Sequence, residues 1–212
     1  MTATAPTTGS HRWNLYPGDH HVHAGSLRER LHARDHNLLS FVARSEHGAF
    51  EAVIPRLSNL ANYSRLWLVV GGAIAASGGP EGRRLASRAL AAIGISSFLT
   101  NVVGKRLWHR DRPSRNELVP VNRHVHMPLS SSFPSGHTAS AFAFATVVTT
   151  GHRELVVPIG GLASLVAYSR VYTGVHYPAD VLIGSVIGTA VGCTVLAVDP
   201  LVTKRLARRP LI

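Results

Sequence analysis

Three short polar segments interrupt an otherwise apolar chain, and together they contain the side chains needed to bind and cleave a phosphate ester. The segments are KRLWHRDRP (105–113), FPSGH (133–137) and SRVYTGVHYPAD (169–180). Polar groups without partners are costly in apolar surroundings, so segments of this kind indicate a functional site. Their complementary contents predict one composite site.

Cations in the first and third segments are suited to an anion. Lys105 and Arg112 are seven residues apart, which is about two helical turns, so on a helix both would project from one face. Arg170 adds another cation. A planar guanidinium beside an ammonium binds phosphate oxygens well. We therefore predict that Lys105, Arg112 and Arg170 are phosphate ligands.

The second segment predicts a helix start that can bind an anion. Ser135 precedes an apolar run, where it can cap the helix while backbone N–H groups around Gly136 point outward at its positive end. Gly136 has no side chain to obstruct a phosphoryl group. His137 follows in the first turn, where it could protonate a leaving oxygen as the general acid.

The third segment supplies a nucleophile and its support. His176 and Asp180 are four residues apart, a spacing at which side chains on a helical turn meet. A carboxylate on one imidazole nitrogen fixes the tautomer and stabilises the cation, which leaves the other nitrogen to attack phosphorus. Pro178 suits the first turn of the helix that follows. His176 is therefore the predicted nucleophile, oriented by Asp180.

Other polar residues have ordinary structural explanations. Taken singly, FPSGH could be a capped helix start, His176 a core histidine, and the arginines an interfacial anchor. Histidines near the N-terminus lack the regular spacing of a metal site, and the single cysteine lies in an apolar run, so we predict no metal site and no cofactor; these residues are His20, His21, His23 and Cys193. Several cations and histidines within the first segment, or between it and the second, are predicted to lie at the membrane surface, with a role in shaping a headgroup pocket as the alternative: His109, Arg110, Arg115, Arg123, His124 and His126.

Apolar helical runs must position the three segments. The runs are 66–76, 89–103, 138–150, 155–168 and 181–198. Several are shorter than the roughly 20 residues that cross a bilayer, so helices buried in a soluble α-protein are the alternative. Richness in small residues favours the bilayer, where it permits close helix packing. Gly184, Gly188 and Gly192 share one helix face and are predicted to pack against a neighbouring helix.

The remainder of the chain completes an all-α, integral-membrane bundle of about five spanning helices. Residues 1–33 are predicted to form a flexible extension, with no cleaved signal peptide. An amphipathic helix over 35–56 is predicted to lie at the membrane interface. The phosphatase domain would cover 34–202, followed by a basic tail over 203–212.

The net charge limits the kinds of binding partner, and the distribution of the charged residues predicts the orientation in the membrane. The chain has 22 Lys and Arg against 11 Asp and Glu, which indicates an anionic partner. Nucleic-acid binding is the alternative from another class, but neither a basic motif with interleaved aromatics nor finger spacing supports it, and we expect no nucleic acid. Cations cluster at the end of the bundle opposite the three segments. The positive-inside rule therefore predicts a cytoplasmic-membrane protein with an outward-facing site.

The three segments match the pattern KxxxxxxRP, PSGH and SRxxxxxHxxxD, and in this the chain resembles the type 2 phosphatidic acid phosphatase superfamily. The resemblance implies that His176 forms a phosphohistidine without a metal, that Asp180 orients it, and that His137 protonates the leaving alkoxide. It implies a phosphate site formed by Lys105, Arg112, Ser135, Gly136 and Arg170.

The same resemblance implies a phosphate on a long apolar tail as the substrate. Phosphatidic acid, phosphatidylglycerol phosphate, undecaprenyl diphosphate and prenyl-phosphoribose phosphate all stay open, as do a monoester or a diphosphate and the oligomeric state. Vanadate-dependent haloperoxidase is a remote alternative, against which the apolar runs and small size argue.

Overall fold

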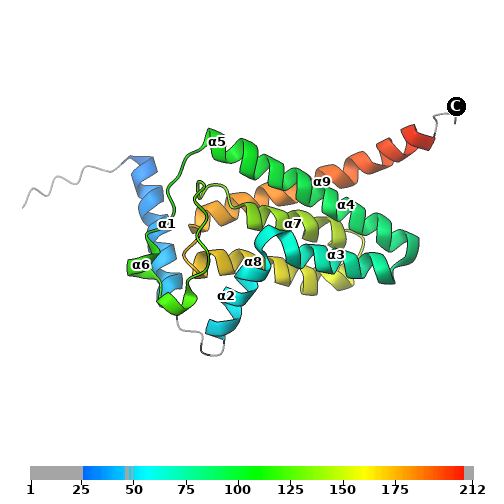
Figure 1. Cartoon of the computed structure of the whole chain (residues 1–212). Helices are drawn as coiled ribbons and strands as arrows, with labels where there is room; N and C mark the ends of the chain where they lie inside the picture. The colour runs from blue at the N-terminus through cyan, green and yellow to red at the C-terminus, as the bar shows by residue number, and fades with distance from the viewer. Residues whose placement is uncertain (1–25, 46–47, 49, 208–212) are drawn as a thin grey trace, which may run out of the picture.

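The protein is built of helices throughout the part of the chain that the computed structural model describes, residues 26–45, 48 and 50–207 (Figure 1). No strand occurs within these ranges, so the all-α prediction is confirmed. The helical elements are α1 (Leu27–Arg44), α2 (Phe50–Leu60), η1 (Asn62–Ser64), α3 (Arg65–Ser77), α4 (Gly79–Phe98), η2 (Leu99–Gly104), α5 (Lys105–Leu107), α6 (Arg115–Leu118), η3 (Val121–Arg123), α7 (Gly136–Thr149), η4 (Arg153–Leu155), η5 (Val156–Gly160), α8 (Gly161–Tyr172) and α9 (Pro178–Ala207).

Three continuous helical stretches are long and apolar enough to cross a membrane: Gly79–Leu107, Arg153–Tyr172 and Pro178–Asp199. The other two predicted spans correspond to α3 and α7, which have only 13 and 14 residues. Most residues of α7 are buried, because it lies at the centre of the bundle, between α4, α8 and α9 (Figure 1). A helix enclosed by other helices need not face lipid along its length.

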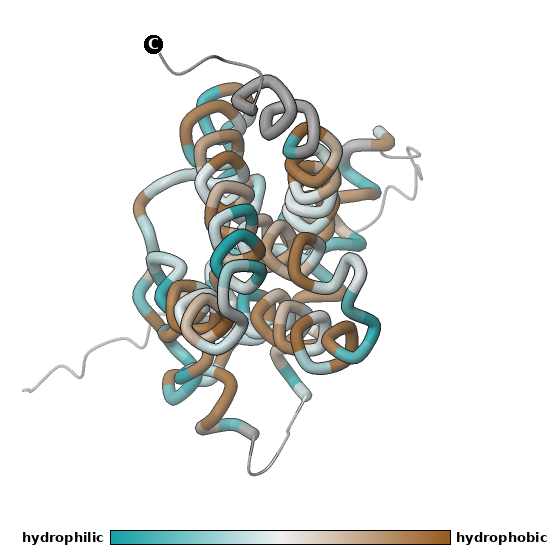
Figure 2. The backbone as a smooth tube through the Cα atoms, turned by 90° about the vertical axis from the view of Figure 1, so that its right-hand side faces the viewer, coloured by the Kyte–Doolittle hydropathy of each residue, from teal (hydrophilic) through white to brown (hydrophobic). Residues whose placement is uncertain are grey.

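The outer surface of the bundle is suited to contact with lipid. Trp67 and Phe144 pack in the core with their ring centroids 5.0 Å apart. Figure 2 shows hydrophobic residues recurring along the helices. Large apolar side chains on the outer faces are nevertheless exposed; they include Leu68, Val69, Ile95, Phe98, Leu165, Leu182 and Val186. Exposed apolar surface of this extent is typical of a face that lies against a membrane.

Close contact between α7 and α9 depends on the three glycines predicted to share a helix face. A Cβ atom would lie 2.5 Å from the Ser135 carbonyl oxygen at Gly184, and 2.2 Å from the Ala139 carbonyl oxygen at Gly188. At Gly192 it would lie 2.7 Å from the Thr146 side chain. Only glycine allows these backbones to approach so closely, which confirms the predicted packing role.

We expect Gly188→Ala to lower the melting temperature of the detergent-solubilised protein, because its methyl group would overlap the backbone of α7. Overpacking of this kind costs about 1–3 kcal/mol. Gly94→Ala is the matched control, since Gly94 is also a helical glycine but has no atom within 4 Å of the added Cβ. A Gly188→Ala protein as stable as Gly94→Ala would contradict the close contact.

The N-terminal region differs from the prediction. The single amphipathic helix expected over 35–56 is two helices, α1 and α2. Helix α1 begins at Leu27, within the predicted extension, because Ser26 and Glu29 form a capping box in which each side chain accepts a backbone N–H bond from the other. It lies crosswise at one end of the bundle (Figure 1). The domain boundary near residue 33 and the tail boundary at 203 stay predictions.

Candidate active site

The three polar segments meet at the end of the bundle where α1 lies. Residues 105–113 follow the long α4 stretch, 133–137 lead into α7, and 169–180 connect α8 to α9. A pocket of about 310 Å³ opens there, and five of the predicted site residues line it: Lys105, Arg112, Gly136, His137 and His176. Ser135, Arg170 and Asp180 are fully buried next to these residues.

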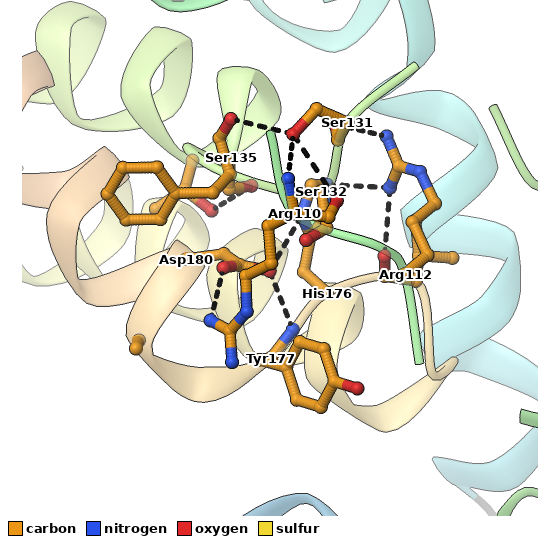
Figure 3. Close-up of polar contacts among 12 residues, drawn as sticks. Arg110, Arg112, Ser131, Ser132, Ser135, His176, Tyr177 and Asp180 are labelled. Atoms are coloured by element: carbon orange, nitrogen blue, oxygen red, sulfur yellow. Dashed lines mark hydrogen bonds and ion pairs between the residues drawn. The ribbon is translucent and has the colours of Figure 1, made fainter. Parts of the chain in front are cut away.

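His176 is held between an arginine and a carboxylate (Figure 3). Arg112 Nη1 lies 3.3 Å from His176 Nε2, and a guanidinium only donates, so Nε2 must be the unprotonated nitrogen. The proton then resides on Nδ1, which lies 3.5 Å from Asp180 Oδ2. That is too long for a hydrogen bond, and catalytic contacts commonly shorten when substrate binds. In the ligand-free protein the Nε2 lone pair accepts from Arg112, so this guanidinium must transfer its contact to a bound anion before Nε2 can act as a nucleophile.

Burial keeps His176 neutral. Its side chain is 2% exposed, and desolvation lowers its pKa from 6.5 to about 4, with Arg170 and Arg112 adding repulsion and Asp180 acting in the opposite direction. Only the neutral imidazole has a lone pair for attack. The environment therefore maintains the nucleophilic form at physiological pH.

This protonation state predicts the pH dependence of activity. Because the pKa of His176 is lowered, its neutral form should persist as the pH falls through 6.5, and the acid-side decline of kcat/KM should come only near pH 4. The measurement is kcat/KM from pH 3.5 to 8, divided by the separately titrated fraction of the reactive substrate ionisation state. An acid-side decline with an enzyme ionisation near pH 6.5 in the corrected profile would contradict this burial effect.

Lys105 and Arg112, two of the predicted phosphate ligands, converge by a different route from the one predicted. Lys105 and Arg112 do not share a helix face, because α5 ends at Leu107 and Arg112 lies in an irregular segment. They meet at Ser130, whose Oγ accepts from Lys105 Nζ at 3.1 Å and from Arg112 Nη2 at 3.5 Å. Arg112 is fixed further by the carbonyl oxygens of Ser130 and Val175, at 2.9 and 2.8 Å.

Arg170 is buried with much of its hydrogen-bonding capacity unused. Its side chain is fully buried, and Nη1 donates to the Ser58 carbonyl oxygen and hydroxyl at 3.2 and 2.8 Å. Nε and Nη2 have no hydrogen-bond partner among the described residues. A buried guanidinium with two free donors is suited to an anion that presents two oxygens.

The start of α7 brings further donors to the pocket. Ser135 occupies the N-cap, but its hydroxyl lies 3.0 Å from that of Thr138 and does not bind a backbone N–H group, contrary to the predicted capping role. At Gly136 a Cβ would lie 2.9 Å from Asn101 Oδ1, so a larger residue would have to displace the Asn101 side chain. His137 Nε2 lies 2.9 Å from Asn62 Oδ1 on η1, a contact that the sequence did not indicate.

Two arginines that were predicted to lie at the membrane surface form ion pairs inside the folded structure instead. Arg110 forms ion pairs with Asp35 and Asp180 at 2.6 and 2.7 Å. Arg123 is 2% exposed and pairs with Glu51. Both arginines also lie over tyrosine rings, with distances to the ring centroid of 4.0 and 4.4 Å. The surface prediction was wrong for both, because their charges are neutralised by residues distant in the sequence.

Metal ligands are not grouped in the described part of the chain, where no three His, Cys, Asp or Glu side chains lie together as a candidate site. His20, His21 and His23 lie outside the described residues. The candidate site thus consists of histidines, one carboxylate and cations.

Comparison with known proteins places this site in a family. A sequence profile of the PAP2 superfamily matches residues 85–203. The decaprenylphosphoryl-5-phosphoribose phosphatase of Mycobacterium tuberculosis H37Rv is 37% identical over 107 residues, covering 48% of this chain and 56% of the relative. The Escherichia coli K12 protein named putative undecaprenyl-diphosphatase YbjG is 35% identical, covering 52% of this chain and 54% of that protein. The chain thus spans about half the length of these relatives.

Solved structures agree with the profile. LpxE of Aquifex aeolicus has a TM-score of 0.61 and 26% identity, covering 76% of this chain and 93% of that one. The PAP2-type phosphatidylglycerolphosphate phosphatase of Bacillus subtilis, described as transmembrane, has a TM-score of 0.63 and 25% identity, covering 81% and 87%. The apolar helices and these neighbours together indicate an integral membrane protein. The sequence resemblance is confirmed, and the chain belongs to the PAP2 superfamily.

Proposed function

We propose that this protein is a membrane phosphatase that hydrolyses a phosphate ester or diphosphate on a lipid or polyprenyl carrier through phosphohistidine at His176. The observation that carries the proposal is the neutral, buried imidazole of His176, with Asp180 on one side and Arg112 at the nitrogen facing the pocket. The unpaired donors of Arg170 supply the anion affinity that such a nucleophile requires.

The proposed reaction has two steps. Lys105, Arg112, Arg170 and the amides at the start of α7 bind the phosphoryl oxygens and stabilise their charge in the transition state. His176 Nε2 forms a bond to phosphorus as the ester P–O bond breaks, and His137 donates a proton to the leaving oxygen. Water then cleaves the P–N bond, giving its proton to His137 and releasing phosphate. Asp180 stabilises the imidazolium that exists between the steps.

Polyprenyl-linked phosphates are the substrate class that we place first. The mycobacterial and E. coli relatives are named for decaprenylphosphoryl-phosphoribose and undecaprenyl diphosphate. The lining of the pocket near His137 is also polar, with Asn62, Ser97 and Asn101, which suits a leaving group that carries hydroxyl or phosphate oxygens. Phosphatidylglycerol phosphate is the second candidate, because the B. subtilis structural neighbour is named for it.

We propose that α3 and α7 complete a five-helix membrane bundle and that α1 lies at the interface. Arg30, Arg34 and Leu38 of α1 are exposed, as an interfacial helix requires. Arg83, Arg84 and Arg153 lie at the end opposite the pocket, which supports a cytoplasmic membrane location with the pocket facing outward. The cations of α1 lie at the pocket end and oppose this orientation unless they bind lipid headgroups.

The test is phosphate release by the purified protein in detergent with EDTA present. The substrates are undecaprenyl diphosphate, a prenyl-phosphoribose phosphate, phosphatidylglycerol phosphate and phosphatidic acid. We expect metal-independent turnover that is fastest on a polyprenyl substrate. Absence of release from all four, or release that EDTA stops and added metal restores, would contradict the proposed mechanism. Preference for a glycerolipid would reverse only the substrate order.

A further inference from the structure

Asp35 lies outside the segment that the family profile matches, yet its carboxylate is built into the support of the active site. It is on α1 and is 6% exposed. Oδ2 accepts from Arg110 Nη2 at 2.6 Å, and Oδ1 accepts from the backbone N–H of Ala179 at 2.9 Å. Oδ2 thus binds the side chain that pairs with Asp180, and Oδ1 binds the backbone N–H group of the residue before Asp180, in the first turn of α9.

Arg110 connects this carboxylate to the nucleophile. Its Nη1 donates to Asp180 Oδ1 at 2.7 Å, and its guanidinium lies 4.0 Å from the centre of the Tyr177 ring (Figure 3). Desolvation lowers the pKa of Arg110, but the contacts with Asp35 and Asp180 outweigh it and raise the pKa overall. The continuous order of contacts is Asp35, Arg110, Asp180 and His176.

The first consequence of this arrangement is geometric. Asp180 Oδ2 accepts from the backbone N–H of Tyr177 at 3.0 Å and lies 3.5 Å from His176 Nδ1. Its other oxygen is held by Arg110, which lies in the irregular segment after α5 and is not fixed by a helix of its own. Asp35 fixes the second nitrogen of Arg110, and so fixes the plane of the Asp180 carboxylate.

The second consequence is electrostatic. Arg110 and Asp180 alone would form a neutral pair, which would stabilise a positive charge on His176 only weakly. With Asp35 the three side chains carry a net charge of −1, because one cation is shared by two carboxylates. That charge favours the imidazolium that forms when Nε2 attacks phosphorus, in a site where Arg112 and Arg170 oppose it.

We propose that Asp35 is a positioning residue for catalysis, acting through Arg110 on the Asp180–His176 pair. The inference rests on the proposed phosphohistidine mechanism and extends it to α1. Asp35 does not line the pocket, so it should affect the chemical step and not the binding of substrate. A purely structural role, in which Asp35 only attaches α1 to the start of α9, would not depend on Arg110.

The experiment compares Asp35→Asn with Asp111→Asn in the full-length protein. Asp111 is a matched control, since it adjoins Arg110 but its side chain is 97% exposed and, within the described part of the chain, its one ion pair is with His109, at 3.5 Å. We expect Asp35→Asn to lower kcat about 10- to 100-fold, the range for residues that orient a reacting group through another, with KM within about twofold of the native value. Asp111→Asn should leave both constants within about twofold.

A double-mutant cycle with Arg110→Gln distinguishes the relay from a structural effect. If Asp35 acts through Arg110, Asp35→Asn should change kcat less than about twofold once Arg110 is replaced. An equal loss in both backgrounds, or native kcat in Asp35→Asn, would overturn the inference. Should Asp35→Asn not fold, Arg110→Lys tests the same link, because an ammonium cannot bind two carboxylates with a planar fork; native kcat there would overturn it too. Failure of the native protein to release phosphate would instead refute the proposed function.

Discussion

Replacing His176 with asparagine is expected to reduce phosphate release to the background rate, a loss in kcat of roughly 10⁴-fold or more. The amide has no nucleophilic nitrogen, so no P–N bond can form. Asparagine is also polar and smaller, so we expect the buried site to fold around it. The measurement is phosphate release, together with trapping of labelled phosphoprotein from a substrate labelled in the transferred phosphoryl group. The native enzyme should yield an acid-labile, base-stable adduct, and the variant none.

His109→Asn is the control for this experiment. His109 lies in the same polar segment as Arg112, but its side chain is 81% exposed and contacts only the exposed Asp111 among the described residues. Its replacement should leave turnover and the adduct unchanged. Persistent turnover in His176→Asn, or an adduct on another residue, would remove His176 from the role of nucleophile.

Arg170→Met is expected to reduce activity far more than stability. Loss of the two free donors of Arg170 should lower kcat/KM about 10²- to 10³-fold, the range for one oxyanion-binding donor or more. The melting temperature should fall only slightly, because loss of the two hydrogen bonds to Ser58 is offset by removal of a buried charge that has no counter-ion in the ligand-free protein, and methionine fills a similar volume. Activity is measured on the best substrate of the panel, and stability by thermal unfolding in detergent.

Arg123→Met provides the contrast. Arg123 is as buried as Arg170, but it pairs with Glu51 and donates to the Ala43 carbonyl oxygen at 2.8 Å. Removing it leaves these groups unsatisfied, so we expect a loss of about 1–3 kcal/mol in stability and little direct effect on chemistry. If Arg170→Met were the less stable of the two variants, the unpaired donors of Arg170 would not destabilise the ligand-free protein.

The sequence identifies well the side chains that meet in the pocket, but it identifies the residues that support them poorly. Lys105, His137 and His176 are recognisable because each lies in a polar segment within an apolar chain, where a charge or an imidazole is unusual. Asn62 and Asp35 lie in segments of mixed polarity, and each meets its partner 75 residues further along the chain. Such pairings are products of tertiary structure, and no local period or spacing in one sequence indicates them.

Helix boundaries are also predicted only in part from the sequence. The apolar periodicity locates the five core helices, but not where α4 begins. The apolar run that marks this helix begins only at residue 89, whereas α4 starts at Gly79 with a proline in its first turn. Likewise, α7 has 14 residues and is too short to count as a span by length and hydropathy. Neither criterion takes account of its enclosure by neighbouring helices.

Close contact between α7 and α9 has a consequence for the range of substrates. The backbones touch at Ser135 and Gly184, and the Ser135 N–H group donates to the Asp180 carbonyl oxygen at 3.0 Å. The start of α7 and the segment that holds His176 are therefore fixed to each other by direct backbone contacts. The opposite wall is η1, where Tyr63 and Ser64 adopt φ of 55° and 57° and where His137 is joined to Asn62. Under the proposed function, we therefore expect bulkier lipid substrates to be accommodated on the η1 side of the pocket, while the spacing between His176 and the phosphate stays nearly constant.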